Sequence, residues 1–184
     1  MGTPAGAIIQ TKRLILNSLR DEDTATVFAY RSDPVTSRYQ GWKPADEAEV
    51  ARFIADQQAQ PFGTLDRWCQ LAIRERASGE LLGDFGVHFP STLDDPIEFG
   101  LSLRPDAQRK GFARESMEAA IDLAFNRWGY RRVVASVDPR NSASTALCRA
   151  LGMRQEAHHL ESYLFRGEWV DDMVFALLAS EWRK

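Results

Sequence analysis

The chain has 184 residues, of which 44% are hydrophobic and 27% are charged, and its formal net charge is −3. This length fits one domain over residues 1–184 with a buried core, and no apolar run approaches the ~20 residues that a membrane-spanning helix needs. The acidic balance without a basic tail disfavours nucleic acid as a partner, and two cysteines and three scattered histidines show no metal-ligand spacing.

The N-terminal residues 1–7 lack the charged segment and long apolar run of a secretory signal. We therefore expect a cytoplasmic location. Two cysteines are too few for a disulfide scaffold, so both thiols are expected to be reduced.

The first third of the chain predicts one strand and two helices. Residues 13–19 form a short apolar run that suits a strand, and acids at 21–23 mark the beginning of a helix that ends at 32–34. A second helix is predicted from about Ala45 to Gln60, with Pro61 closing it. We expect these two helices to form one wall of a cleft.

Three strands are predicted next, in direct succession. An apolar run at 68–73 is followed by a turn at 78–80 and by a second run, Leu81–Phe89. After a loop rich in proline and aspartate comes Ile97–Leu103. Successive strands with short connections favour an antiparallel meander.

The stretch from Glu98 to Asp122 predicts a strand, a loop and a helix. The strand ends at Leu103, Pro105 breaks it, and a loop centred on Gly111 enters a segment with helical spacing of apolar residues, which Gly129 stops. A glycine loop that enters a helix directs several unpaired backbone N–H groups toward one point, and the helix dipole favours an anion there.

The charges around this loop fit a phosphate site. Arg104, Arg109, Lys110 and Arg114 flank the loop against the single acid Asp106, so the segment is cationic within an acidic chain. A polyanionic ligand is therefore predicted. The alternative is that Gly111 only eases a tight turn and that the cations form a solvated face.

The last third of the chain predicts a strand, a short helix and a closing hairpin. Arg132–Val137 is a β-branched run typical of a strand buried on both faces, and a strand–helix–strand unit favours parallel neighbours. A helix follows between about 142 and 152, and two strands then meet at a turn at 166–167. The sequence thus predicts an α/β fold with a mixed, mostly antiparallel sheet and helices on both faces.

The segment Gln108–Ala113, with the sequence Gln-Arg-Lys-Gly-Phe-Ala, resembles the Gln/Arg-x-x-Gly-x-Gly/Ala signature of the Gcn5-related N-acetyltransferases (GNAT), which holds the pyrophosphate of acetyl-CoA. Five ordered stretches narrow the resemblance to the RimJ/RimL-type ribosomal-protein N-acetyltransferase subgroup: Thr11–Leu14, Glu98–Leu101, Asp138–Ser144, Leu151–Glu156 and Gly167–Asp171.

The resemblance implies the GNAT fold and an enzyme that moves the acetyl group of acetyl-CoA to a primary amine. The amine is a protein N-terminal α-amine or a small-molecule amine, and it attacks directly in a ternary complex. Acetyl-CoA serves as cosubstrate without a metal. The subgroup, together with tryptophans near the C-terminal strands, also implies a homodimer. The alternative function is a non-catalytic acyl-CoA-binding or regulatory domain.

The resemblance also implies roles for individual residues. Main-chain groups of Leu101, Ser102 and Leu103 would pair with the pantetheine arm, and Asn141 would hydrogen-bond the same arm. Ser144 would protonate the leaving thiolate, unless its hydroxyl only bonds the backbone at a helix start. The pyrophosphate would bind the backbone amides of Gln108, Arg109, Lys110, Gly111, Phe112, Ala113 and Arg114.

The general base is the point at which the sequence departs from the subgroup, whose base carboxylate falls on Tyr163. The nearest acid, Glu161, lies two residues earlier and would share its strand face. Glu98, Glu161 and Glu115 are the candidates for the base, and a solvated or salt-bridged surface acid is the alternative for each. Cys148 is expected in the core rather than as an acyl carrier.

Three tryptophans, Trp42, Trp68 and Trp169, either line the acceptor pocket or belong to the core.

Overall fold

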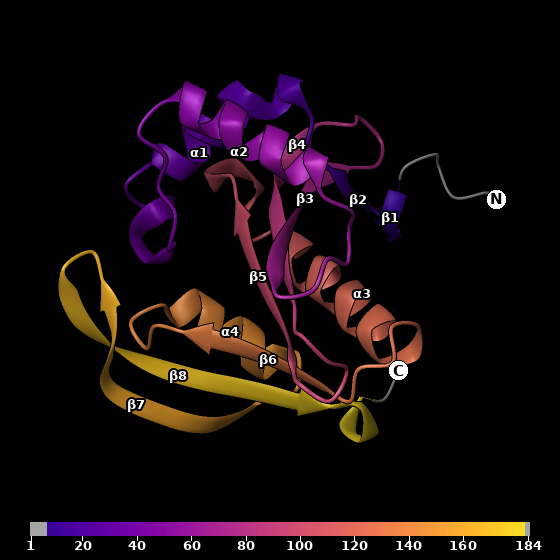
Figure 1. Ribbon diagram of the computed structural model, residues 1–184, viewed down its shortest axis with the longest axis vertical. Helices are drawn as coiled ribbons and strands as arrows, with labels where there is room; N and C mark the ends of the chain where they lie inside the picture. The colour runs from indigo at the N-terminus through magenta and orange to yellow at the C-terminus, as the bar shows by residue number, and fades with distance from the viewer. Residues whose placement is uncertain (1–6, 183–184) are drawn as a thin grey trace.

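The computed structural model describes residues 7–182, and these build one eight-stranded sheet in the order β1-β2-β3-β4-β5-β6-β8-β7 (Figure 1). The strands are β1 (Ala7–Gln10), β2 (Leu14–Ser18), β3 (Arg67–Glu75), β4 (Leu81–Phe89), β5 (Ile97–Leu103), β6 (Arg132–Val137), β7 (Arg154–Phe165) and β8 (Glu168–Leu178). Every neighbouring pair is antiparallel except β5 and β6, which are parallel. The predicted mixed, mostly antiparallel sheet is confirmed.

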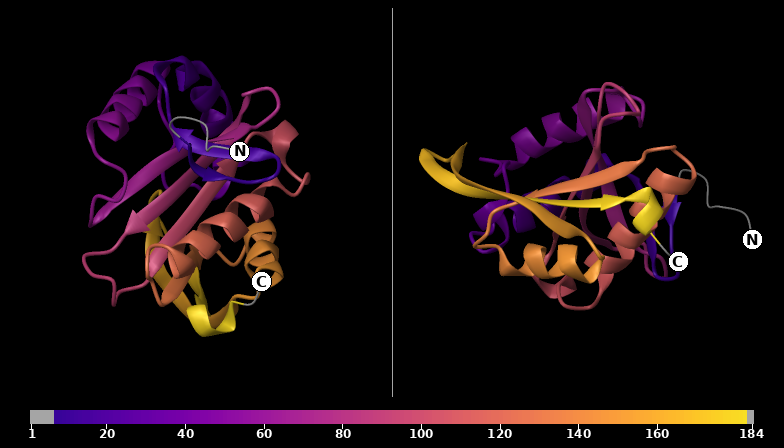
Figure 2. Two further views of the ribbon diagram at one scale, coloured as in Figure 1. Left: turned by 90° about the vertical axis from the view of Figure 1, so that its right-hand side faces the viewer. Right: turned by 90° about the horizontal axis from the view of Figure 1, so that it is seen from below.

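Helices cover both faces of the sheet, as predicted (Figure 2). Helices α1 (Thr24–Ser32) and α2 (Glu47–Ala59) lie on one face, and α3 (Phe112–Asn126) and α4 (Ser142–Ala150) lie on the other. Short 3-10 turns occur at Asp21–Asp23, Thr36–Tyr39, Pro105–Ala107 and Ala179–Glu181.

Strand alternation explains why there are two cores. On β3, Leu71 and Ile73 point into the larger cluster beneath α3, whereas Ala72 between them points into the smaller cluster beneath α1 and α2. Phe85, Ile121 and Phe175 are fully buried in the larger cluster. Each face of the central strands is therefore fixed by its own set of apolar contacts.

Several element bounds differ from those predicted. β1 was missed, because four residues in isolation carry no strand signal and β1 is defined only by its pairing with β2. Helix α3 ends at Asn126 rather than at Gly129, since the N–H groups of Arg127 and Trp128 both donate to the Leu123 carbonyl. Trp128 then leaves the helical path, and its ring packs against Phe89 at 5.5 Å between centroids.

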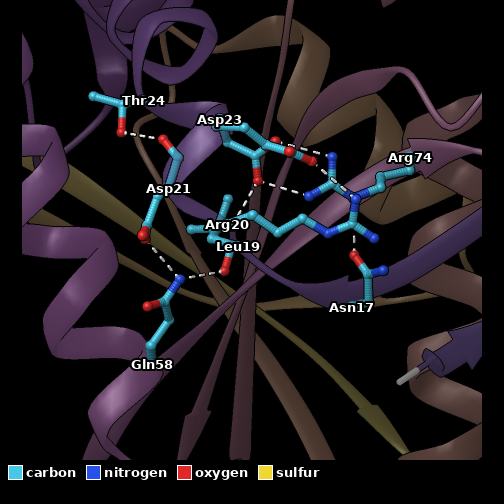
Figure 3. A network of polar contacts seen from close by, with 9 residues as sticks. Asn17, Leu19, Arg20, Asp21, Asp23, Thr24, Gln58 and Arg74 are labelled. Atoms are coloured by element: carbon cyan, nitrogen blue, oxygen red, sulfur yellow. Dashed lines mark hydrogen bonds and ion pairs between the residues drawn. The ribbon is translucent and has the colours of Figure 1, made fainter. Parts of the chain in front are cut away.

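A buried ion pair fixes the beginning of α1 to the sheet (Figure 3). Arg74 on β3 donates from Nη1 and Nη2 to the two carboxylate oxygens of Asp23 at 2.9 and 2.6 Å, and its Nε donates to Asn17 Oδ1 at 3.0 Å. Asp23 also accepts the Arg20 N–H at 2.7 Å. A bidentate pair of this kind holds both side chains in one geometry.

Within the part of the chain that the structure describes, no helix is long and apolar enough to cross a membrane. The same residues contain no group of three or more histidine, cysteine, aspartate or glutamate side chains arranged to hold a metal ion.

Candidate active site

Strands β5 and β6 pair at only two positions and then separate. Ile97 lies opposite Val133 and Glu98 lies opposite Val134, after which β5 runs steeply away from β6 (Figure 1). The β6 side of β5 from Phe99 to Leu103 therefore has no partner strand among residues 7–182. Unpaired main chain of this kind can hydrogen-bond an extended ligand as if the ligand were a further strand.

The predicted arm-binding residues Leu101, Ser102 and Leu103 all lie on this open edge, but they are not equivalent. The Leu103 carbonyl already accepts a hydrogen bond from Gln108 Nε2 at 3.1 Å. The Ser102 hydroxyl is buried and lacks a hydrogen-bond partner in the described residues. A buried hydroxyl without a partner costs free energy, so the Ser102 side chain is a buried group and only its main chain lies on the open edge.

The loop after β5 has the backbone of an anion site. Arg109 and Gly111 adopt left-handed conformations, with φ of 60° and 81°, and α3 begins directly afterwards with no side-chain cap. The amides from Arg109 to Arg114 have no hydrogen-bond acceptor within residues 7–182. Successive N–H groups in such a turn form a concave nest for an anion, and a non-glycine residue at positive φ marks strain typical of functional loops.

One predicted donor is corrected by the structure. The Gln108 amide donates to the Pro105 carbonyl at 3.3 Å, because the 3-10 turn Pro105–Ala107 closes on it. The available amides thus begin at Arg109 rather than at Gln108.

The four cations of the loop fall into two groups, those that are bound to an acid and those that are not. Arg104 is bound to Asp106 and Glu80, and Arg114 is bound to Glu118. The side chains of Arg109 and Lys110 have neither an ion pair nor a hydrogen bond among the described residues. They are the two predicted cations that remain available to a polyanion.

Arg13 supports the loop from below, a role that the sequence did not reveal. Its Nη1 donates to the Lys110 carbonyl at 3.0 Å, and its guanidinium lies 4.6 Å from the Phe112 ring centroid. A Cβ at Gly111 would lie 3.3 Å from Arg13 Nη2, so a side chain there is opposed by both the positive φ and the underlying arginine.

Glu115, one of the three candidate bases, is a structural residue. Its carboxylate accepts the Thr11 hydroxyl at 2.5 Å, the Arg13 N–H at 2.9 Å and Arg13 Nε at 2.6 Å. Although burial acts to raise it, these hydrogen bonds lower the pKa of Glu115. Glu115 lies on α3, which covers one face of the sheet. Glu98 lies on β5, and its side chain points to the opposite face. The contacts of Glu115 support the alternative considered for it, a salt-bridged acid.

Ser144 lies in the first turn of α4, which follows the cap residue Asn141. Asn141 Oδ1 accepts the Ser144 N–H at 3.1 Å, so this oxygen of the predicted arm-binding residue serves as the helix cap. The Ser144 hydroxyl makes no hydrogen bond in the described residues, whereas the Thr145 hydroxyl bonds the Ser142 carbonyl at 3.0 Å. The backbone-bonding role considered for Ser144 therefore belongs to Thr145.

Glu98 stands at the point where the sheet opens. His88 on β4 lies directly opposite it and Trp68 on β3 lies opposite His88, so the three side chains share the face of α1 and α2. Burial is the largest cause that raises the pKa of Glu98; Asp172 also raises it, and His88 and the Ser136 backbone N–H partly oppose this. A half-buried carboxylate with a raised pKa is suited to accept a proton from an amine.

A β-bulge removes the argument for Glu161. His159 lies opposite Asp172 and Tyr163 opposite Val170, so β7 has extra residues between them, and Glu161 adopts φ of 43°. Regular strand alternation therefore does not hold between Glu161 and Tyr163, and the argument that placed them on one face loses its basis. Tyr163 is 55% exposed.

Cys148 lies in the larger core cluster and is 3% exposed. Burial raises the pKa of its thiol to about 11. A thiol of this kind is almost entirely protonated at neutral pH, so its placement in the core agrees with packing rather than with nucleophilic catalysis.

Comparison with known proteins identifies the family. The model of an acetyltransferase (GNAT) domain matches residues 13–154, which include the open edge of β5, the Arg109–Arg114 amides and the beginning of α4. The chain belongs to the GNAT acetyltransferase family. It is an acetyl-CoA-dependent N-acetyltransferase by this membership.

Relatives with N-acetyltransferase names match this chain over nearly its whole length or over about half of it. The uncharacterized N-acetyltransferase YoaA of Bacillus subtilis is 29% identical over 93% of this chain and 96% of its own length. The [ribosomal protein uS5]-alanine N-acetyltransferase of Escherichia coli is 30% identical over 45% of this chain and 43% of its own length.

Solved GNAT structures share the fold. A GNAT-family acetyltransferase from Bacillus anthracis superposes with a TM-score of 0.84 at 22% identity, covering 94% of this chain and 99% of that one. Spermidine N-acetyltransferase from Vibrio cholerae, solved in complex with CoA and spermine, gives a TM-score of 0.76 at 18% identity, with coverage of 93% and 98%.

Proposed function

We propose that residues 1–184 form one N-acetyltransferase domain that moves the acetyl group of acetyl-CoA to a primary amine by direct attack in a ternary complex. The observation that carries the proposal is the position of Glu98. It is the last residue of β5 paired with β6, and the open edge that would hold the thioester arm begins immediately after it. A base at this point lies beside the bond to be broken.

Each proposed residue answers a chemical requirement. An alkylammonium ion has a pKa near ~10 and must lose a proton before its nitrogen can attack the thioester, so Glu98 accepts that proton. Main-chain groups of Leu101 to Leu103 orient the arm, and the amides from Arg109 to Arg114 hold the pyrophosphate. The free hydroxyl of Ser144 donates a proton to the departing thiolate, and it is restored by the second proton that the nitrogen loses as the amide forms.

The alternative function, a non-catalytic acyl-CoA-binding or regulatory domain, keeps the phosphate loop but needs no base. Incubation with acetyl-CoA and a panel of amines, with free thiol measured over time, separates the two. Thiol release that depends on an amine supports catalysis. Acetyl-CoA binding without release for any amine would favour the binding-only role.

The acceptor is a protein N-terminal α-amine or a small-molecule amine. The names of relatives point both ways, since one acts on a ribosomal-protein alanine and another, 27% identical over 46% of this chain, on spermidine. Fold likeness does not select an acceptor. Mass detection of acetylated products from peptides and amines in one panel would identify it.

The phosphate loop is tested by Gly111→Val. The new side chain meets a positive φ and the Arg13 guanidinium, so the nest of amides would be distorted. We expect acetyl-CoA binding to weaken at least tenfold, about 1.4 kcal/mol, in calorimetry. Equal affinity in the variant and the wild type, with both folded, would contradict this loop as the pyrophosphate site.

We further propose a cytoplasmic homodimer of the RimJ/RimL-type subgroup. Both cysteines, Cys69 and Cys148, are free and buried, which suits a reducing compartment. The hairpin of β7 and β8 exposes large apolar side chains, Leu160, Tyr163, Leu164 and Trp169. Exposed apolar groups gathered on one element are typical of contact surfaces.

A further inference from the structure

The indole ring of Trp68 lies over two glycines, Gly86 and Gly100, on the face of the sheet that carries α1 and α2. A Cβ at Gly86 would lie 3.0 Å from the Trp68 ring and 3.0 Å from Gln70 Oε1, and a Cβ at Gly100 would lie 3.9 Å from the same ring. The indole therefore extends from β3 across β4 to β5. Neither glycine has the positive φ that would require glycine for backbone reasons. Their small size instead leaves room for the ring.

The other side of the indole is accessible. Trp68 is 43% exposed, whereas Trp42 is partly buried against Phe53, with ring centroids 4.4 Å apart. A large aromatic residue on a sheet usually buries its ring in a core, and Trp68 belongs to neither core cluster. One side of the indole ring thus lies against the two glycines, and the other side is accessible to solvent.

The position of the ring links the proposed base to the proposed arm site. Gly100, beneath the end of the indole, is two residues from Glu98 on the same strand face and directly precedes Leu101. Residues i and i+2 of a strand are about 7 Å apart. The indole and Glu98 therefore lie close together on one face, beside the edge proposed to hold the arm.

The charge of this face selects the kind of amine. Glu98 and Asp172 interact electrostatically on it, and Ser136 Oγ donates to Asp172 Oδ1 at 2.6 Å. Arg132, which lies on β6 two residues before Val134, the register partner of Glu98, is bound to Glu156. His88 lies beside the indole, with ring centroids 5.4 Å apart. Glu98, whose carboxylate interacts with Asp172, shares this face with the indole, and carboxylates on one face with an exposed indole favour a cation and oppose an anion.

We propose that Trp68, seated on Gly86 and Gly100, is the acceptor platform, and that it selects protonated alkylamines without a carboxylate at the far end of the carbon chain. The carbon chain packs on the open face of the indole and the ammonium group lies over the ring beside Glu98 and Asp172. This assignment rests on the proposed acetyl transfer and specifies its substrate class.

The test uses matched acceptors of one chain length: 1,4-diaminobutane, butylamine and 4-aminobutanoate. We expect kcat/KM for the wild type to be lowest for 4-aminobutanoate, because the acidic face opposes its carboxylate. Trp68→Ala should raise KM for the diamine at least tenfold, a loss of about 1.4 kcal/mol, and leave the acetyl-CoA dissociation constant unchanged. Trp68→Phe should remain within about threefold of the wild type, since it keeps an aromatic face.

Trp68→Leu and Leu93→Ala separate the platform from simpler effects. Leucine keeps an apolar contact without a π face, so Trp68→Leu should behave like Trp68→Ala. Leu93, 56% exposed in the loop between β4 and β5, is a control whose truncation should change neither KM nor the melting temperature. If Trp68→Leu matches Trp68→Phe, the ammonium contact is overturned.

Gly86→Ala moves the indole without changing Trp68 itself. The added methyl group meets the ring at 3.0 Å, so KM for the diamine should rise severalfold. In the Trp68→Ala background the same change should cost less than twofold, because the ring is gone. Equal effects in both backgrounds would overturn the glycine seat.

Failure of this inference is distinguishable from failure of the proposed function. If the wild type turns over amines and Trp68→Ala leaves every KM unchanged, the platform is wrong and the transferase stands. If the wild type binds acetyl-CoA but releases no thiol with any amine, the proposed function fails and the platform fails with it.

Discussion

At the scale of single residues, the proposed division of labour between Glu98 and Ser144 follows from the energetics of the two proton transfers. A free thiol titrates near ~8.5, so a thiolate is a fair leaving group near neutral pH without help. A protonated alkylamine is not a nucleophile, so under the proposed mechanism its deprotonation by Glu98 would govern the rate.

Replacement of Glu98 by glutamine is therefore expected to lower kcat/KM for an alkylamine at least ~10²-fold, and Ser144→Ala to lower it less. Steady-state assays of both variants with the same amine, together with acetyl-CoA affinity as a control for folding, provide the comparison. The opposite order of effects would overturn the role of Glu98.

Glu98 also predicts a pH dependence of stability. Because burial raises its pKa in the folded protein, the folded state binds a proton more tightly than the unfolded state. The contribution of Glu98 to stability is thus fully present below its unfolded pKa and is lost as pH rises through the folded pKa. Urea titrations at pH values between the unfolded and folded pKa of Glu98 should show that this contribution to the free energy of unfolding declines with rising pH in the wild type and not in Glu98→Gln.

The residues of the site differ in how far the sequence predicts them. The glycine and the amides of the phosphate loop are local features, so their spacing alone indicates an anion site. The role of Glu115 depends on Thr11 and Arg13, more than 100 residues away in the chain, and no local pattern contains it. The bulge at Glu161 was not predicted because a bulge, unlike regular alternation, has no clear sequence signal.

At the scale of elements, three of the strands were predicted to the residue. β4, β5 and β6 have the predicted bounds, Leu81–Phe89, Ile97–Leu103 and Arg132–Val137. The hairpin turn at Arg166–Gly167 was also predicted, and both of its residues have positive φ. β1 and the end of α3 depend on tertiary partners, and these were the elements that the sequence missed or misplaced.

The anchor of α1 carries a prediction of its own. Asp23→Ala leaves the Arg74 guanidinium buried without its partner, since the two side chains are only 4% and 6% exposed. We expect a loss of about 3–5 kcal/mol in the free energy of unfolding. Asp56→Ala, which removes an exposed ion pair with Arg67 at 3.5 Å, is the matched control and should change stability by less than ~1 kcal/mol. Equal losses in chemical denaturation would contradict the anchor.

At the scale of the whole molecule, the sheet consists of two parts joined through the short pairing of β5 with β6. Strands β1 to β5, together with α1 and α2, form one part. Strands β6, β8 and β7 form the second part, and its β7–β8 hairpin projects from the molecule (Figure 1). The proposed chemistry lies at this junction, where both parts contribute side chains to one face.

The projecting hairpin leads to a prediction about assembly. If Leu160, Leu164 and Trp169 are contact residues, the protein should have twice the monomer mass of 20.8 kDa in light scattering at micromolar concentration. Trp169→Glu should shift the population toward the monomer, because a buried, unpaired carboxylate opposes association. A wild-type monomer under these conditions would contradict the homodimer.

Arg166 ties the two parts together across the sequence. Its guanidinium donates to the carbonyls of Ser37 and Gln40, which precede it by 129 and 126 residues. Contacts between such distant residues form late in folding, because a long loop must close first. During synthesis on the ribosome, the hydrogen bonds of Arg166 with Ser37 and Gln40 cannot form until the β7–β8 hairpin has emerged. The nascent chain therefore contains the proposed pyrophosphate loop, Arg109–Arg114, well before it contains the β7–β8 hairpin that completes the proposed acceptor face.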